Sequence, residues 1–166
     1  HRLQKNGNRV LSIGKLHYRS EQDPTGFDEQ IIPYHVKDGV GDAQGLLRQD
    51  LLPMHLLRRF VMEAGPGESW VTEYDREVAK RACSWLLEEA PRHNDVPWVL
   101  FVSFICPHPP FQCPPSFFNA VDPDSVPLPP DERPQHPSLA DVRKRWLLEE
   151  PINEEARHRA ARAYYG

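Results

Sequence analysis

The sequence has no apolar run long enough to cross a membrane and no block of lysines or arginines. A membrane-spanning helix needs about 20 consecutive apolar residues, and the longest apolar stretch, Trp98–Ile105, is far shorter. The net charge is −4 and the pI is about 6.1, so the chain lacks the excess positive charge with which proteins bind nucleic acid. We therefore expect neither a membrane span nor a nucleic-acid partner.

Cysteine is also scarce, with only Cys83, Cys106 and Cys113 in the chain. An odd number of cysteines cannot form a complete disulfide framework, and their spacing matches no metal-binding pattern. Cysteine usage therefore leaves the cellular compartment open.

Proline, by contrast, is abundant, and eleven of the 18 prolines lie between Pro107 and Pro137. Because proline lacks the backbone N–H that helices and sheets require, this segment is predicted to be a long irregular loop. An alternative is a polyproline ligand for an SH3-like or WW-like domain. The irregular spacing of the prolines, directly after an apolar strand, makes a packed loop the simpler interpretation.

The most informative stretch is Trp98–Ile105, which is apolar except for Ser103. Such a run predicts a strand that is buried on both faces in a parallel sheet. A helix capped by Thr72 is predicted before it, because apolar residues recur there at helical spacing: Val78, Ala79, Ala82, Cys83, Leu86 and Ala90. A helix followed by a buried strand is typical of an α/β fold.

A second strand is predicted at Arg9–Ile13, after a helical turn over His1–Asn6 that ends at Gly7 or Asn8. Ser20–Gly45 carries turn signals and is predicted to be a loop around a short apolar piece, Phe27–Val36. Further helices are expected over Met54–Ala64, with its face formed by Leu56, Leu57, Phe60, Val61 and Ala64, over Ser138–Glu150, and after the capping residue Asn153.

Both predicted strands are followed by cationic or titratable side chains. His108 comes after the Trp98–Ile105 strand, while Lys15 and His17 follow Arg9–Ile13 and point the same way if the chain stays extended. Ligands of open α/β sheets bind at the carboxyl ends of the strands. If the two strands are parallel neighbours, these three residues therefore belong to one site.

Other histidines offer weaker candidates. His35 and Asp42 could line the mouth of the site, although exposed loop positions are the simpler interpretation. A zinc site formed by His17, His35, His55 and His108 matches no recognised ligand spacing. Because two strands do not form a viable core, we expect the chain to be an internal piece of a larger α/β enzyme, with sequence missing at both ends.

Three motifs resemble the sulfatase family of the alkaline-phosphatase-like superfamily: Gly14-Lys15-Leu16-His17, Gly26-Phe27-Asp28 and Pro107-His108-Pro109-Pro110-Phe111. The nearest likeness is to choline-sulfatase-like and phosphonate-monoester-hydrolase-like members. The resemblance extends to the last helix, Arg157–Gly166. It implies that residues 1–166 are one internal segment of a catalytic domain, with a mostly parallel sheet flanked by helices and incomplete at both ends.

The resemblance also implies roles for individual residues. Lys15 would contact the sulfate and the nucleophile, His17 would hydrogen-bond the nucleophile's hydroxyl, and His108 would face the ester oxygen. The parent protein would then hydrolyse a small-molecule sulfate ester or, on the same scaffold, a phosphonate or phosphate ester.

The family's remaining machinery is not recognisable in this segment. Its nucleophile is a formylglycine made from the first residue of Cys/Ser-x-Pro-x-Arg. Its divalent metal, Ca²⁺ foremost with Mn²⁺ or Mg²⁺ as alternatives, is held by an Asp-Asp pair near the amino terminus and an Asp-His/Asn pair near the carboxyl terminus. Cys113-Pro-Pro-Ser-Phe117 imitates the nucleophile motif, but Phe117 replaces the arginine, so Cys113 is interpreted as an ordinary loop cysteine. The segment alone is expected to be inactive, and the sequence does not define the substrate or the oligomeric state.

Overall fold

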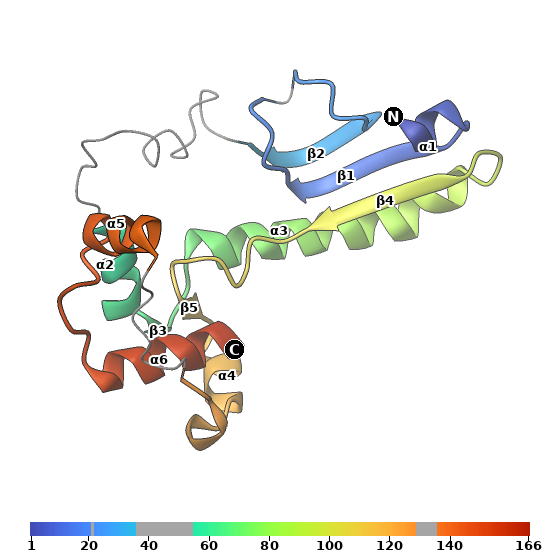
Figure 1. The fold of residues 1–166 in the computed structure, drawn as a ribbon. Helices are drawn as coiled ribbons and strands as arrows, with labels where there is room; N and C mark the ends of the chain where they lie inside the picture. The colour runs from blue at the N-terminus through green and yellow to red at the C-terminus, as the bar shows by residue number, and fades with distance from the viewer. Residues whose placement is uncertain (21, 36–54, 129–135) are drawn as a thin grey trace. The chain divides into compact units, whose positions relative to one another are not determined.

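The computed structural model describes residues 1–20, 22–35, 55–128 and 136–166 (Figure 1). The chain divides into two compact units. The first unit comprises His1–Gly41 and Glu73–Ile105, and the second comprises Asp42–Thr72 and Cys106–Gly166. Each unit is described separately below.

The first unit contains a parallel three-stranded sheet in the order β2-β1-β4. Its strands are β1 (Arg9–Lys15), β2 (Glu29–Tyr34) and β4 (Trp98–Ser103). Both β2 and β4 run parallel to the central strand β1. The two strands predicted from the sequence are therefore parallel neighbours, and an α/β architecture is confirmed.

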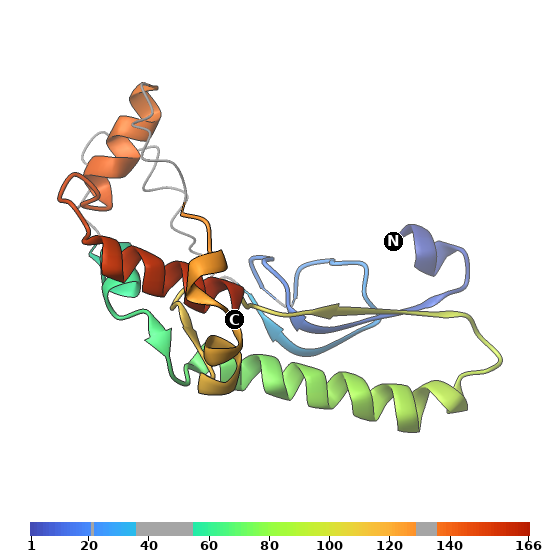
Figure 2. The same ribbon diagram turned by 90° about the horizontal axis from the view of Figure 1, so that it is seen from below.

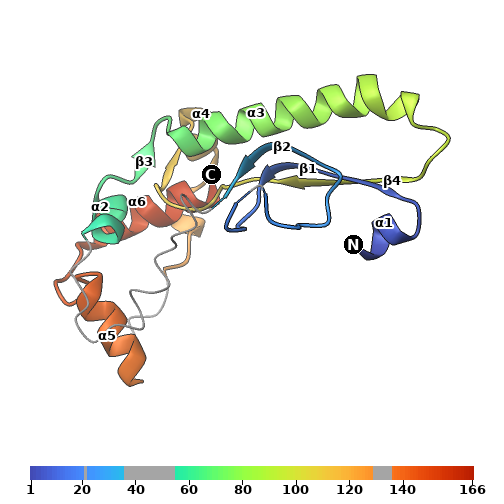
Figure 3. The same cartoon turned by 90° about the horizontal axis from the view of Figure 1, so that it is seen from above.

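Helix α3 (Trp70–Ser84) runs along one face of this sheet (Figures 2 and 3). It continues as a π-helical turn, Trp85–Glu89, and a 3₁₀ turn, Ala90–Arg92. Side chains from the sheet and the helical segment form one buried cluster: Leu11, Ile13, Val78, Ala82, Trp85 and Ala90. Burying a large apolar side chain of this kind stabilises the fold by about 1.5–3 kcal/mol.

The other face of the sheet is covered by α1 (Arg2–Lys5) and the connection between β1 and β2 (Figures 2 and 3). The predicted helical turn ends as expected, because Gly7 adopts a positive φ of 79°. On this face Phe27 stacks on Phe101, with 6.1 Å between the ring centroids.

The predicted cap of helix α3 was misplaced by one turn. Ser69, rather than Thr72, precedes the helix, and the two residues exchange hydrogen bonds: the Ser69 N–H donates to Thr72 Oγ1 at 2.9 Å, and the Thr72 N–H donates to Ser69 Oγ at 3.3 Å. This reciprocal pair satisfies two N–H groups at the start of the helix. The predicted buried face is correct at Val78, Ala82 and Ala90, whereas the other predicted positions are exposed: Ala79, Cys83 and Leu86.

Strand β4 is not buried on both faces, contrary to its prediction. Trp98 is 36% exposed and Phe101 47% exposed. Within the described residues β4 pairs only with β1. It therefore forms an edge of the sheet, where fewer neighbouring side chains shield it from solvent than at a central strand.

Strand β2 lies inside the segment predicted to be a loop. It pairs with β1 through matches such as Ile13 with Ile31. Pro33 lies within it, and a proline is tolerated in a sheet on an edge strand. The proline and the polar flanks obscured this strand in the sequence.

The second unit consists mainly of short helices. They are α2 (Leu56–Met62), α4 (Pro115–Ala120), α5 (Pro137–Arg145) and α6 (Glu154–Tyr165), with a 3₁₀ turn at Pro123–Ser125. Two very short strands, β3 (Gly65–Pro66) and β5 (Gln112–Cys113), pair in parallel. Cys113, Phe118 and Ala163 form its buried cluster. The described part of the chain contains no helix long and apolar enough to span a membrane.

Helix α6 begins as predicted, because Asn153 Oδ1 accepts a 2.7 Å hydrogen bond from the Ala156 N–H. Its Arg159 guanidinium donates to the carbonyl oxygens of Ala64 and Met62, at 2.7 and 2.9 Å. These bonds satisfy the carboxyl end of α2.

Two predictions for the second unit were wrong in part. The Pro107–Pro137 segment is not wholly irregular, because it includes β5 and α4. The predicted face of α2 is only half-buried, apart from the buried Ala64, and Leu56 is exposed. Met54, the first residue of that predicted helix, lies outside the described residues.

Candidate functional site

The carboxyl ends of β1 and β4 lie at the same edge of the sheet, because the strands are parallel and Gly14 is paired with Ser103. Lys15 is the last residue of β1. It is half-buried, and its ammonium makes no hydrogen bond or ion pair to any residue that the structure describes. A cation in this state is available to an anionic ligand.

Gly14 permits the close approach of the two strands beside Lys15. Its φ is +104°, and a Cβ atom at this position would collide with the carbonyl oxygen of Ser103 and lie 3.2 Å from Val78 Cγ1. Only glycine fits both the backbone conformation and the space. The glycine of the Gly-Lys-x-His motif is therefore required by the fold.

The end of β2 bulges next to Lys15. The pairing passes from Ile13 with Ile31 to Lys15 with Tyr34, so β2 carries one more residue than β1 over this interval. Ile32 has a φ of 44°, which is unusual for a β-branched residue. Bulges of this kind re-aim the side chains that follow them.

Tyr74 of helix α3 holds the bulge in place. Its hydroxyl donates a 2.6 Å hydrogen bond to the carbonyl oxygen of Ile32. Burial, with smaller contributions from Asp75 and Tyr34, raises the pKa of Tyr74 to about 12. The hydroxyl therefore remains protonated and able to donate across the neutral range.

His17 and His35 also belong to the first unit. Strand β1 ends at Lys15, so the expected alternation of Lys15 and His17 along an extended chain does not continue to His17, which is exposed. His35 follows Tyr34, the residue paired with Lys15. The ring of His35 packs against Tyr18 with 6.2 Å between centroids. Asp42 lies outside the described residues.

His108 belongs to the second unit and is exposed. Its Nδ1 lies 2.8 Å from the carbonyl oxygen of Pro109. Because a carbonyl oxygen only accepts, Nδ1 must carry the hydrogen in this contact, which leaves Nε2 as the nitrogen for a ligand. Lys15 and His17 therefore lie two residues apart in the first unit, whereas His108 lies in the second unit.

The described residues offer no metal centre. They contain no group of three or more His, Cys, Asp or Glu side chains that could hold a metal ion. The four histidines considered for zinc divide between the units, with His17 and His35 in the first and His55 and His108 in the second. No chemical step is therefore assigned to a metal held by the described residues.

Cys113 lies in β5 rather than in a loop and is a free, buried thiol. Burial raises its pKa, although the nearby Arg162 charge opposes the shift. A thiol with a raised pKa is a poor nucleophile. This environment agrees with the interpretation that Cys113 is not the nucleophile.

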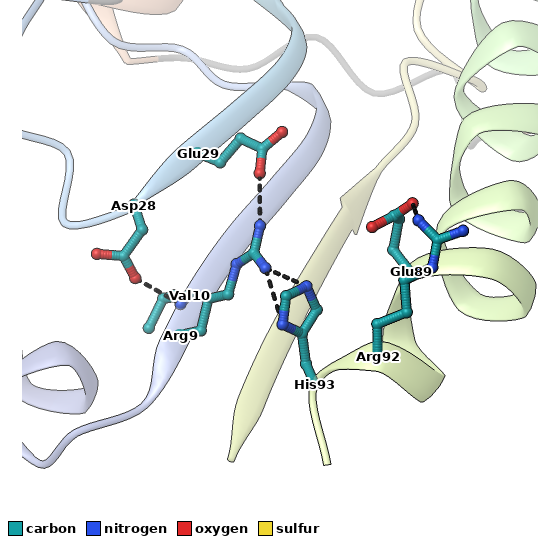
Figure 4. Close-up of polar contacts among 7 residues, drawn as sticks. All are labelled: Arg9, Val10, Asp28, Glu29, Glu89, Arg92 and His93. Carbon is teal, nitrogen blue, oxygen red and sulfur yellow. Dashed lines mark hydrogen bonds and ion pairs between the residues drawn. The ribbon is translucent and has the colours of Figure 1, made fainter. Parts of the chain in front are cut away.

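Sequence reasoning missed a polar network at the opposite, amino-terminal edge of the sheet (Figure 4). The Arg9 guanidinium donates a 3.0 Å hydrogen bond to the Glu29 carboxylate, and on its other side it contacts the ring nitrogens of His93. The Asp28 carboxylate accepts 2.7 Å bonds from the Val10 N–H and from the Gln4 side chain, and the Val10 bond is the larger cause that lowers the pKa of Asp28. The network joins the starts of the strands, so its role is structural.

The second unit also contains a cavity of about 770 Å³. Its lining combines apolar and aromatic side chains with charged ones such as Arg143, Glu149 and Arg157. The ring centroids of Phe111 and Tyr164 in this lining are 6.4 Å apart. None of the three predicted site residues lines it. A role in the predicted chemistry is therefore not assigned to the cavity.

Comparison with known proteins gives the chain no family: neither a protein-family model nor a curated protein sequence matches it.

Proposed function

We propose that the protein containing this chain is a metal-dependent sulfuric-ester hydrolase of the sulfatase type, built on an alkaline-phosphatase-like fold. Lys15, His17 and His108 would be its contribution to the active site. The observation that carries the proposal is the parallel pairing of β1 and β4. It sets the Gly14-Lys15 strand end beside the end of the strand that leads into His108.

The proposed role of Lys15 is to bind the anionic head of the ester. A sulfate ester is negatively charged, and its non-bridging oxygens need fixed positive charge as the ester bond breaks. Lys15 is half-buried, and no acidic side chain among the described residues neutralises its charge. Partial burial also strengthens the attraction relative to bulk water.

The proposed role of His108 is to protonate the leaving oxygen. Its Nδ1 faces the Pro109 carbonyl oxygen, so the proton would be donated from Nε2. A histidine suits this task because its ordinary pKa lies near neutrality. His17 would hydrogen-bond the nucleophile's hydroxyl, a role that only the family resemblance implies.

The nucleophile and the metal would come from parts of the protein outside this segment. When bound, a divalent metal would polarise the sulfate and the nucleophile. The described residues supply no ligand set for it, so the proposed contribution of this segment is limited to anion binding and leaving-group protonation.

A phosphonate or phosphate ester is the alternative substrate, because it presents similar anionic oxygens to a cation. The non-catalytic alternative, a polyproline ligand in Pro107–Pro137, would need an extended proline-rich chain. It is weakened by the strand and helix at Gln112–Cys113 and Pro115–Ala120.

The test is hydrolysis by the full-length protein, produced together with a formylglycine-generating enzyme. An aryl sulfate and an aryl phosphonate monoester would be compared, with and without a chelator. Lys15→Ala and His108→Ala are each expected to reduce kcat/KM by about 10²-fold or more. Lys5→Ala, which removes an exposed lysine of α1, serves as the control and should not change it.

Chelator-sensitive hydrolysis that is lost in both active-site variants would support the proposal, and the preferred ester would identify the substrate class. Wild-type activity in both variants would show that the strand-end residues are structural and would contradict the proposal.

A further inference from the structure

The side chain of Tyr34 begins next to that of Lys15 at the carboxyl edge of the sheet. Tyr34 is the register partner of Lys15, and its carbonyl oxygen accepts a 3.1 Å hydrogen bond from the Leu16 N–H. Neighbouring strands lie about 4.8 Å apart, and residues paired in a parallel ladder project their side chains on the same face. Lys15 and Tyr34 therefore share one face of the sheet.

The bulge at Ile32 determines which face Tyr34 takes. Ile31 is paired with Ile13, and both belong to or pack against the cluster between the sheet and α3. In a regular strand Tyr34, three residues after Ile31, would point to the opposite face. The extra residue of the bulge reverses this alternation, so Tyr34 points to the same face as Ile31.

Contact with Tyr74 confirms this orientation and supports the ring. Tyr74 belongs to α3, and its ring meets that of Tyr34 edge to face, with 6.2 Å between the centroids. The Tyr74 hydroxyl is in turn bonded to the Ile32 carbonyl oxygen at 2.6 Å. Tyr34 nevertheless remains 41% exposed. A supported, partly exposed aromatic ring thus presents apolar surface beside the Lys15 cation.

We propose that Tyr34 is a specificity-determining residue, whose ring contacts the organic group of the ester while Lys15 binds the anionic head. This inference rests on the proposed function. All such esters share the anionic head, so the protein can discriminate among them only through the organic group. An aromatic ring gains from contact with a second aromatic ring beyond the burial of apolar area, whereas a methyl group has little surface to bury. Tyr34 should therefore favour aryl esters over small alkyl esters.

The test measures binding of two non-hydrolysable anions to the full-length protein by isothermal titration calorimetry. Benzenesulfonate and methanesulfonate carry the same anionic head and differ in the organic group. Phenylphosphonate and methylphosphonate are the corresponding pair if the phosphonate ester is the preferred substrate. The wild-type protein should bind the aryl anion more tightly than the methyl anion. Tyr34→Ala should weaken binding of the aryl anion about tenfold and leave binding of the methyl anion unchanged, which also shows that the variant is folded.

Two further variants separate the ring of Tyr34 from its hydroxyl and from a general effect. Tyr34→Phe keeps the ring and should retain the wild-type preference for the aryl anion. Phe117→Ala removes an exposed aromatic ring of α4 and is the matched control, which should change neither affinity. Equal wild-type affinities for the two anions, equal weakening of both in Tyr34→Ala, or loss of the preference in Tyr34→Phe would each overturn the inference.

Lys15→Ala distinguishes failure of this inference from failure of the proposed function. If Lys15→Ala weakens binding of both anions while Tyr34→Ala does not reduce the preference for the aryl anion, only the role of Tyr34 is wrong. If Lys15→Ala weakens binding of neither anion, the proposed function fails and the role of Tyr34 fails with it.

Discussion

The backbone N–H of Ile105 donates a 2.7 Å hydrogen bond to Oδ1 of Asp75. Asp75 lies in the second turn of helix α3, and Ile105 lies two residues beyond the end of β4. The bond satisfies a backbone N–H where the sheet ladder has ended, and it fixes the chain three residues before His108. Helix α3 therefore holds the carboxyl ends of two strands, through Tyr74 at β2 and Asp75 at β4.

Replacing Asp75 should destabilise the first unit. Asp75→Ala removes the acceptor from a buried N–H and is expected to lower the free energy of unfolding by about 1–3 kcal/mol. Asp75→Asn retains a side-chain carbonyl and should lose less. Urea unfolding followed by circular dichroism measures both, and equal losses in the two variants would show that the carboxylate charge, not the hydrogen bond, is responsible.

Gly14→Ala should be among the most damaging single substitutions in the sheet. The added methyl group would meet the Ser103 carbonyl oxygen, and the residue would be forced to keep a φ of +104°. We expect a loss of about 3 kcal/mol or more. Gly7 also has a positive φ, of +79°, but nothing lies within 4 Å of its Cβ position, so Gly7→Ala should cost only about 1 kcal/mol. Similar losses for both variants in denaturant titrations would contradict the predicted collision.

Tyr74→Phe should reveal the raised pKa of Tyr74 as a pH-dependent stability difference. At neutral pH the lost hydroxyl bond should cost about 1 kcal/mol. The folded pKa is about 12 and the ordinary value 10, so the stabilisation is complete below pH 10 and declines as the pH rises toward 12. The difference between wild type and Tyr74→Phe should therefore shrink over this interval. A constant difference would mean that Tyr74 titrates normally.

Asp28→Asn should weaken the amino-terminal edge of the sheet, with the opposite pH dependence. The Val10 N–H and the Gln4 side chain lower the pKa of Asp28 below 3.8. The Asp28 carboxylate should therefore stabilise the folded state fully above pH 3.8. This contribution should disappear as the pH falls through the lowered pKa of the folded state. The cost at neutral pH should be about 1 kcal/mol. Glu29→Gln, which breaks an exposed ion pair, should cost less; acid unfolding curves of both variants test the contrast.

The sequence was most informative where local chemistry determines local structure. The Asn153 cap, the glycine stop at Gly7 and the parallel β1–β4 pair all agree with prediction. A capping side chain, a positive φ and an apolar run each leave a signal within a few residues. The α/β class could be predicted for the same reason.

The remaining features depend on partners distant in the sequence. Strand β2 was missed because Pro33 marks it as irregular, although β1 supplies its hydrogen bonds. The shift of the α3 cap to Ser69 is instead a local ambiguity, because Ser69 and Thr72 are both capping residues and they bond to each other. The bulge at Ile32 and the pairing of Tyr34 with Lys15 left no sequence signal, because both arise from register between strands.

The measurement that tests the central claim most directly is the leaving-group dependence of hydrolysis in His108→Ala. A nitrophenyl ester departs as a stable anion and needs little protonation, whereas a phenyl ester of the same acid needs a proton at the leaving oxygen. If His108 Nε2 donates that proton, kcat/KM for the phenyl ester should fall at least tenfold more than kcat/KM for the nitrophenyl ester. Equal losses for both esters would contradict the assignment of His108 as the proton donor.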